Sequence, residues 1–142
     1  MTNAVHPWRL LREQPNVTLT WHTAGPWGYT NHSTQTISIR TGLDQAQRRC
    51  TLLHELQHIH RGPVTWGMAP IEETRVRKIT AHLLLPNVKE IADAYAWALG
   101  DDHEAAAELW VATPILLDRM RWMNHPAERS YLALRFSEDN TP

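Results

Sequence analysis

The sequence predicts an α+β fold in which a small antiparallel β-sheet lies beside one long helix and an α-helical subdomain follows. Three observations predict it. Two short runs, at 17–21 and 36–39, alternate β-branched or aromatic residues with others, as half-buried strands do. A capped segment at 45–60 places apolar residues at helical spacing. Further helix-start signals follow, and the last of the helices that they predict ends near residue 124.

The chain has 142 residues, which fits one domain with its own hydrophobic core. We expect a catalytic core over about 1–86 and a helical subdomain over about 87–142. Hydrophobic residues make up 42% and charged residues 20%, a globular composition. The net charge of -1 predicts no general attraction to nucleic acid or to anionic membranes.

The single cysteine, Cys50, excludes an internal disulfide and a cysteine zinc cluster. No apolar run is long enough to cross a bilayer. The first 15 residues lack the basic start and apolar stretch of a signal peptide. We therefore expect a soluble, cytoplasmic protein without a membrane partner.

The N-terminal elements can be read in order. Residues 7–13 could form a short helix that opens at a proline. The first strand, 17–21, is broken by Gly25-Pro26 and Gly28. The second strand covers 36–39, and we expect the two strands to pair antiparallel.

The long helix begins at a clear signal. Asp44 is a typical N-cap residue, and Gln47 three positions later completes a capping-box pattern. The helix is predicted over 45–60, and Gly62-Pro63 stops it. Four apolar residues form its buried stripe: Leu52, Leu53, Leu56 and Ile59.

Later helices are predicted over 71–85, from Asn87 to near Gly100, over 103–110 and over 113–124. The apolar residues at 131–136 should pack, and residues 139–142 should fray. Trp21 and Trp97 lie within apolar patterns and are predicted to be core residues.

The chemistry of the chain is predicted from His54-Glu55-Leu56-Gln57-His58, which matches H-E-x-x-H. Residues four apart on a helix differ by about 40° and lie one turn apart, so both imidazoles can reach one zinc ion. Glu55 can then act as the general base, taking a proton from a metal-bound water and passing it to the leaving amine. We therefore predict His54 and His58 as Zn²⁺ ligands and Glu55 as the catalytic residue.

A catalytic zinc needs a third protein ligand. The metzincin pattern would place a histidine where this chain has Val64, and a glycine one position before Gly62. The alternative is a glutamate from the next helix, which begins near Glu72 and Glu73. Spacing alone does not choose between these two, since acidic residues also favour the first turn of any helix.

The stretch from Ile37 to Pro86 resembles the ImmA/IrrE family of small metallopeptidases. The resemblance rests on the strand at 37–39, on residues 48–58 with the H-E-x-x-H motif, on Gly62, and on the ending Ala-x-x-Leu-Leu-x-Pro at 81–86. It is most similar to members from actinobacteria and their phages. The resemblance implies a minimal gluzincin-like core and places the third zinc ligand at Glu73.

The resemblance also implies a function: hydrolysis of a peptide bond in a regulatory protein, such as a transcriptional repressor or an antitoxin, in phage immunity or a stress response. The transition-state donor stays open among Tyr29, Arg61 and Tyr131. Arg77 departs from the family, which commonly has Asn or Asp there. This departure keeps open the alternative of a zinc-containing pseudoenzyme that binds a regulator without cutting it.

A second alternative is DNA binding, because 103–124 resembles a helix-turn-helix. The first residues of a recognition helix contact bases, yet here they are the apolar residues at 114–117. The segment 101–124 carries five acidic residues against Arg119 and Arg121, which makes phosphate attraction poor. We therefore expect a protein partner rather than DNA.

Overall fold

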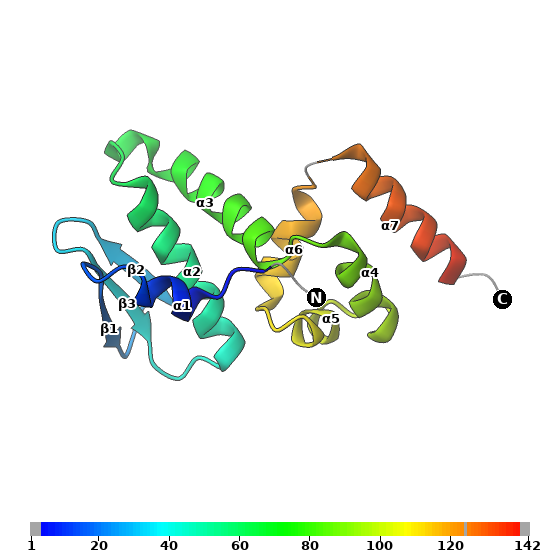
Figure 1. Cartoon of the computed structure of the whole chain (residues 1–142), viewed down its shortest axis with the longest axis horizontal. Coiled ribbons are helices and arrows are strands. Elements are labelled where there is room, and N and C mark those ends of the chain that lie inside the picture. Colours follow the sequence, from blue (N-terminus) through cyan, green and yellow to red (C-terminus); the bar gives the residue numbers. More distant parts are fainter. Residues whose placement is uncertain (1–3, 124, 140–142) are drawn as a thin grey trace. The chain divides into compact units, whose positions relative to one another are not determined.

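The computed structural model describes residues 4–123 and 125–139, with side chains as far as residue 135. The helix expected over 113–124 ends at Arg121, three residues early, and of the residues 139–142 that were expected to fray, 140–142 lie outside the described residues. Within them the chain is α+β, with three strands and a majority of helix (Figure 1). The elements are α1 Pro7–Arg12, β1 Thr18–His22, β2 Gly28–Asn31, β3 Thr36–Arg40, α2 Gln45–Arg61, the 3-10 turn η1 Trp66–Met68, α3 Ala69–Leu84, α4 Val88–Trp97, α5 Asp102–Glu108, α6 Thr113–Arg121 and α7 Pro126–Asp139.

The chain divides into two compact units. One unit is Val5–Thr80, which contains α1, the sheet, α2 and most of α3. The other consists mainly of the residues from Ala81 onward. The division therefore falls inside α3, a few residues before the boundary near Pro86 that the sequence suggested.

The sheet is mixed rather than antiparallel, so the predicted pairing is wrong. The strand order is β1-β3-β2, with β1 parallel and β2 antiparallel to β3. The element missing from the prediction is β2, four residues that include Gly28 and Asn31, two residue types that strands disfavour. Since the chain reverses once before β2 and once after it, β1 and β3 run in the same direction.

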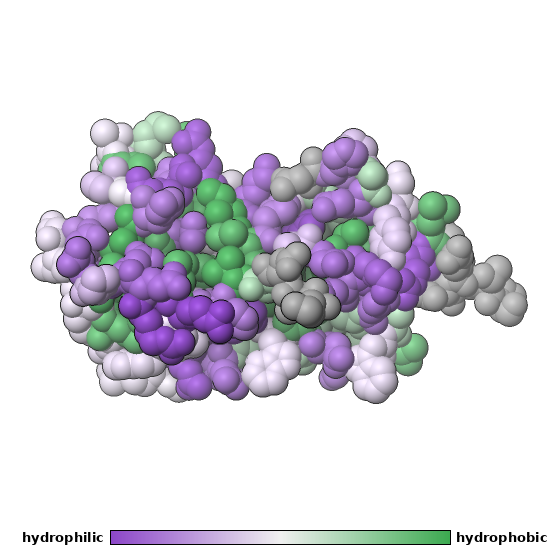
Figure 2. Space-filling view, viewed as in Figure 1, coloured by the Kyte–Doolittle hydropathy of each residue, from purple (hydrophilic) through white to green (hydrophobic). Residues whose placement is uncertain are grey.

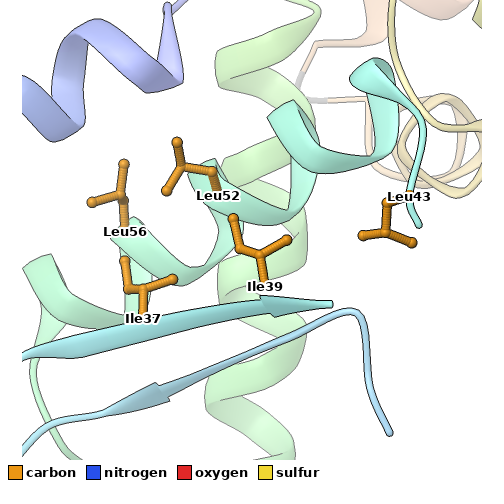
Figure 3. Close-up of a cluster of buried hydrophobic side chains, with 5 residues drawn as sticks. All are labelled: Ile37, Ile39, Leu43, Leu52 and Leu56. Atoms are coloured by element: carbon orange, nitrogen blue, oxygen red, sulfur yellow. The ribbon is translucent and has the colours of Figure 1, made fainter. Parts of the chain in front are cut away.

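The core of the first unit lies between the sheet and α2. Ile37 and Ile39 are fully buried and, two residues apart on β3, share one face. They pack with Leu52 and Leu56, one turn apart on α2, and with Leu43 (Figure 3). This packing fixes which side of α2 faces the sheet, and with it the direction of every other side chain on that helix.

The capping box of α2 is confirmed. The Asp44 side chain accepts from the Gln47 backbone N–H at 2.7 Å, and the Gln47 side chain accepts from the Asp44 N–H at 3.0 Å. His54 and His58, four residues apart within this helix, lie on one face of it, as the motif requires.

The second unit is built from helices around small apolar residues. Its largest buried polar side chain is Arg119 of α6, which is 1% exposed. Its guanidinium donates to the Leu85 carbonyl at 2.7 Å and forms a two-point ion pair with Glu128 at 3.0 and 3.2 Å. The buried apolar residues of this unit are Ala81, Leu84, Leu85, Ile91, Ala92, Ala94, Tyr95, Ala105, Ala106, Val111, Ala112, Leu116 and Leu132.

The surface carries several large apolar side chains among mostly hydrophilic ones (Figure 2). Two of the predicted core residues are among them, since Trp21 is 49% and Trp97 is 73% exposed. Both predictions are wrong: Trp21 lies on β1, an edge strand, and Trp97 ends α4, so neighbours are few on one side. No helix of the described residues has the length and hydropathy that crossing a bilayer requires.

Candidate metal centre

The two histidines of the motif point at the same carboxylate. His54 Nε2 lies 2.8 Å from Glu73 Oε1, and His58 Nε2 lies 2.9 Å from Glu73 Oε2. The two Nε2 atoms are 3.2 Å apart. The two Nε2 atoms and the Glu73 carboxylate therefore converge between α2 and the first turns of α3, with one ligand atom from each residue within 4.8 Å of the others.

This donor set fits a zinc ion. With zinc–ligand bonds of about 2.0–2.1 Å, the ligand atoms of a tetrahedral site are about 3.3 Å apart. The separations of 2.8, 2.9 and 3.2 Å, in which both oxygens of Glu73 take part, are close to that edge but somewhat shorter. Two imidazoles and one carboxylate also match the ligands of many hydrolytic zinc sites, which keep the fourth position open.

Glu72 lies beside Glu73 in the chain but serves a different partner. Its side chain is 7% exposed and accepts from the guanidinium of Arg61, with Nε to Oε1 as the closest contact and Nη2 to Oε2 at 3.3 Å. Adjacent helical positions differ by about 100°, so only one of the two glutamates can face the histidines. The structure brings Glu73 to them and leaves Glu72 in an ion pair.

The charges explain how the site behaves without metal. The hydrogen bond from His54, followed by that from His58, lowers the pKa of Glu73 far below its ordinary value. The hydrogen bond to Glu73 in turn raises the pKa of His58, against the opposing effect of burial. At Glu72, the Arg61 guanidinium lowers the carboxyl pKa. Glu73 is thus held ionised, as a metal ligand must be, whereas a protonated His58 must lose its proton before it can bind a cation.

Glu55 is held next to this group by β2. It is 6% exposed, and its Oε2 accepts from the Thr30 hydroxyl at 2.7 Å. The approach is close because Gly28 has no side chain: a Cβ there would lie 2.5 Å from Thr51 Cγ2 and 3.2 Å from Glu55 Cγ. Gly28, predicted only to break the first strand, therefore allows β2 to pack directly on α2.

These groups open onto one cleft of about 260 Å³. It is lined by Gly28, Tyr29, Thr30, His32, His54, Glu55, His58 and Glu73. The lining includes all four predicted site residues: His54, Glu55, His58 and Glu73. Arg77 is not among the described residues that line the cleft. Thr30 and His32 were missed because nothing in the sequence near 28–32 indicates that this stretch returns to the H-E-x-x-H helix.

The cleft is small, and most of its lining side chains are polar. Three residues of β2, one of the two edge strands of the sheet, line it: Gly28, Tyr29 and Thr30. Comparison of the chain with protein-family models, with curated proteins and with solved structures found no match.

Proposed function

We propose that this chain is a zinc-dependent peptidase of the ImmA/IrrE type, with His54, His58 and Glu73 as the zinc ligands and Glu55 as the general base. The observation that carries the proposal is the convergence of two Nε2 atoms and one carboxylate in a cleft that also holds Glu55. Bound there, zinc would supply a Lewis acid that polarises a carbonyl and activates water.

The residues of the chain supply the rest of the reaction. Glu55 accepts a proton from the attacking water, whose oxygen then bonds to the carbonyl carbon. The C–N bond breaks, and the amine leaves with the proton that Glu55 returns. The Thr30 hydroxyl, 2.7 Å from Oε2, leaves Oε1 as the oxygen that meets the water. This hydrogen bond also limits rotation of the carboxylate during the two proton transfers.

The shape of the site favours an extended peptide as substrate. An edge strand offers unpaired backbone N–H and C=O groups, to which an extended segment can bind as an additional strand. β2 presents such an edge at the cleft, next to Glu55. The backbone of a peptide bound there, rather than one of its side chains, would lie next to His54, His58 and Glu73. The resemblance in sequence points to a regulatory protein, a repressor or an antitoxin, as its source.

The test separates metal binding from catalysis. We expect one zinc per wild-type chain by mass spectrometry of the purified protein, and a loss of zinc in His54→Ala and Glu73→Gln. Glu72→Gln is the matched control, because it makes the same change one residue away and should keep the metal. Zinc retained by Glu73→Gln but lost by Glu72→Gln would refute the ligand assignment.

Catalysis is tested with a peptide library made from a digested bacterial proteome and read by mass spectrometry. Wild type should generate new termini, whereas Glu55→Gln should keep its zinc and generate none. Equal products from the two proteins would assign the cleavage to a contaminant. A zinc-loaded wild type that cuts nothing, including candidate repressors, would favour the pseudoenzyme.

The helix-turn-helix alternative gains no support from the second unit. Of the two arginines in the segment, Arg119 is buried and committed to Glu128. Arg121 lies with its guanidinium 5.7 Å from the ring centre of Trp122. The start of α6 presents Pro114 and Leu117 to solvent, neither of which can read a base edge. A protein partner remains the better proposal for this unit.

A further inference from the structure

His32 lines the cleft and takes no part in the metal site or in holding Glu55. It lies in the turn between β2 and β3 and lines the cleft together with the three ligand residues. Its Nδ1 is buried and has no hydrogen-bond partner within residues 4–123 and 125–139. Buried polar atoms in folded proteins are almost always paired, so an unpaired one at a reaction cleft calls for a reason.

The strand before it sets the side on which His32 lies. Side chains two apart in a strand point to the same face. Thr30 points toward α2, where it reaches Glu55, and Gly28 meets the same helix. Tyr29 is on the opposite face, where its ring lies 4.9 Å from that of His22. His32 follows the strand by one residue and lines the same cleft as Thr30 and Glu55, so it lies on the Glu55 side.

The unpaired Nδ1 also indicates where the imidazole carries its proton. A neutral imidazole has one N–H and one bare nitrogen. A buried N–H without an acceptor is the rarer and costlier of the two unpaired groups. The proton therefore belongs on Nε2. That atom is not among the buried unpaired atoms, and the described residues offer it no partner, so a ligand in the cleft can reach it.

We propose that His32 donates its Nε2–H to the carbonyl oxygen of the scissile peptide as that oxygen becomes negative. This inference rests on the proposed peptidase function. A donor placed in advance at the point where charge develops lowers the barrier more than one that must reorient. Two of the three earlier donor candidates are engaged elsewhere, since Arg61 is bound to Glu72 and Tyr131 accepts from Arg135 within the other unit. The third, Tyr29, lines the cleft but turns its ring toward His22.

The test uses the zinc-loaded full chain and two probes that both bind zinc. A dipeptide phosphonamidate carries a tetrahedral anionic group that resembles the hydrated peptide, while acetohydroxamate is too small to extend far from the metal. His32→Phe keeps a ring of similar shape and removes both nitrogens. His32→Gln restores an N–H donor near the position of Nε2. Ser33→Ala, in the same turn, is the control.

By titration calorimetry, His32→Phe should bind the phosphonamidate about 10- to 100-fold more weakly, the factor that a hydrogen bond to a charged group contributes. Its zinc content, its melting temperature and its affinity for acetohydroxamate should match wild type. His32→Gln should recover part of the loss, and Ser33→Ala should show none. In zinc-loaded protein labelled with ¹⁵N-histidine, the His32 ring should show the Nε2–H tautomer.

Equal phosphonamidate affinity in His32→Phe and wild type would overturn the proposal. So would an equal loss for both probes, which would mean that His32 acts on the metal site as a whole, or an Nδ1–H tautomer. A wild type that holds zinc but does not bind the phosphonamidate would overturn the donor role and leave the ligand assignment intact. A wild type without zinc would refute the peptidase proposal, and the donor role with it.

Discussion

Gly28→Ala should disrupt the contact between β2 and α2 that positions the general base. The added Cβ would lie 2.5 Å from Thr51 Cγ2, whereas carbon atoms in good contact are about 3.5–4.0 Å apart. The strand or the helix must therefore shift by about 1 Å. Overpacking of this kind costs about 1–3 kcal/mol. For a chain of this size that predicts a melting temperature lower by about 4–12 °C.

The shift should affect catalysis more than metal binding. It moves Thr30 away from Glu55, whereas His54, His58 and Glu73 stand on helices that β2 does not carry. We expect Gly28→Ala to keep its zinc and to lose most peptide cleavage. Thermal unfolding followed by circular dichroism, with metal analysis of the same sample, measures both effects.

Two variants make the reasoning refutable. Gly67→Ala is the control, because a Cβ at that position meets no atom within 4 Å. Thr51→Ser removes Cγ2, so adding it to Gly28→Ala should recover much of the lost stability, a coupling that unrelated sites do not show. Two results would refute the reasoning: equal melting temperatures for Gly28→Ala and Gly67→Ala, or no recovery of stability when Thr51→Ser is added. Either would mean that β2 does not approach α2 as closely as described.

Three further predictions concern stability. In metal-free protein the pair between His58 and Glu73 should stabilise the fold most between the ordinary pKa values of 4.5 and 6.5. The raised pKa of His58 gives stability that is lost as pH rises through it, and the lowered pKa of Glu73 gives stability that is lost as pH falls through it. Urea unfolding across this range should show the maximum, and Glu73→Gln should flatten it. Arg119→Met should lower the free energy of unfolding by about 2–4 kcal/mol, since it leaves the Glu128 carboxylate without its buried partner. In urea unfolding, no recovery on adding Glu128→Gln would contradict that reason. Asp44→Ala should cost about 0.5–2 kcal/mol through loss of the helix cap, while Asp44→Asn should cost little; equal losses would exclude capping as the cause.

Local signals predicted the helices well. The start of α2 at Gln45 follows from Asp44 and Gln47, whose side chains satisfy backbone groups within four residues. The helix that Asn87 caps begins at Val88, with the Asn87 side chain accepting from the N–H groups of Lys89 and Glu90. Interactions this short in sequence depend little on the rest of the chain, and for that reason they can be read from it.

The sheet shows where such reading stops. The pattern at 36–39 predicted β3, but neither its central position nor its parallel partner follows from the residues themselves. Both depend on β2, a strand whose composition is poor for strands and which is held by pairing with β3 and by packing on α2. The exposure of Trp21 follows from the same fact, because β1 is an edge strand.

The spacing of His54 and His58 was enough to place two imidazoles on one side of a helix, because an α-helix turns by the same angle at every residue. The choice of Glu73 over Glu72 needed the rotation of α3 against α2, which packing and the Arg61 ion pair establish between residues far apart in sequence. His32 joins the same cleft only because β2 returns to the helix. The repeating geometry of a helix can be predicted from the sequence alone. Which distant segments come together, by contrast, depends on which of them bury one another's apolar side chains.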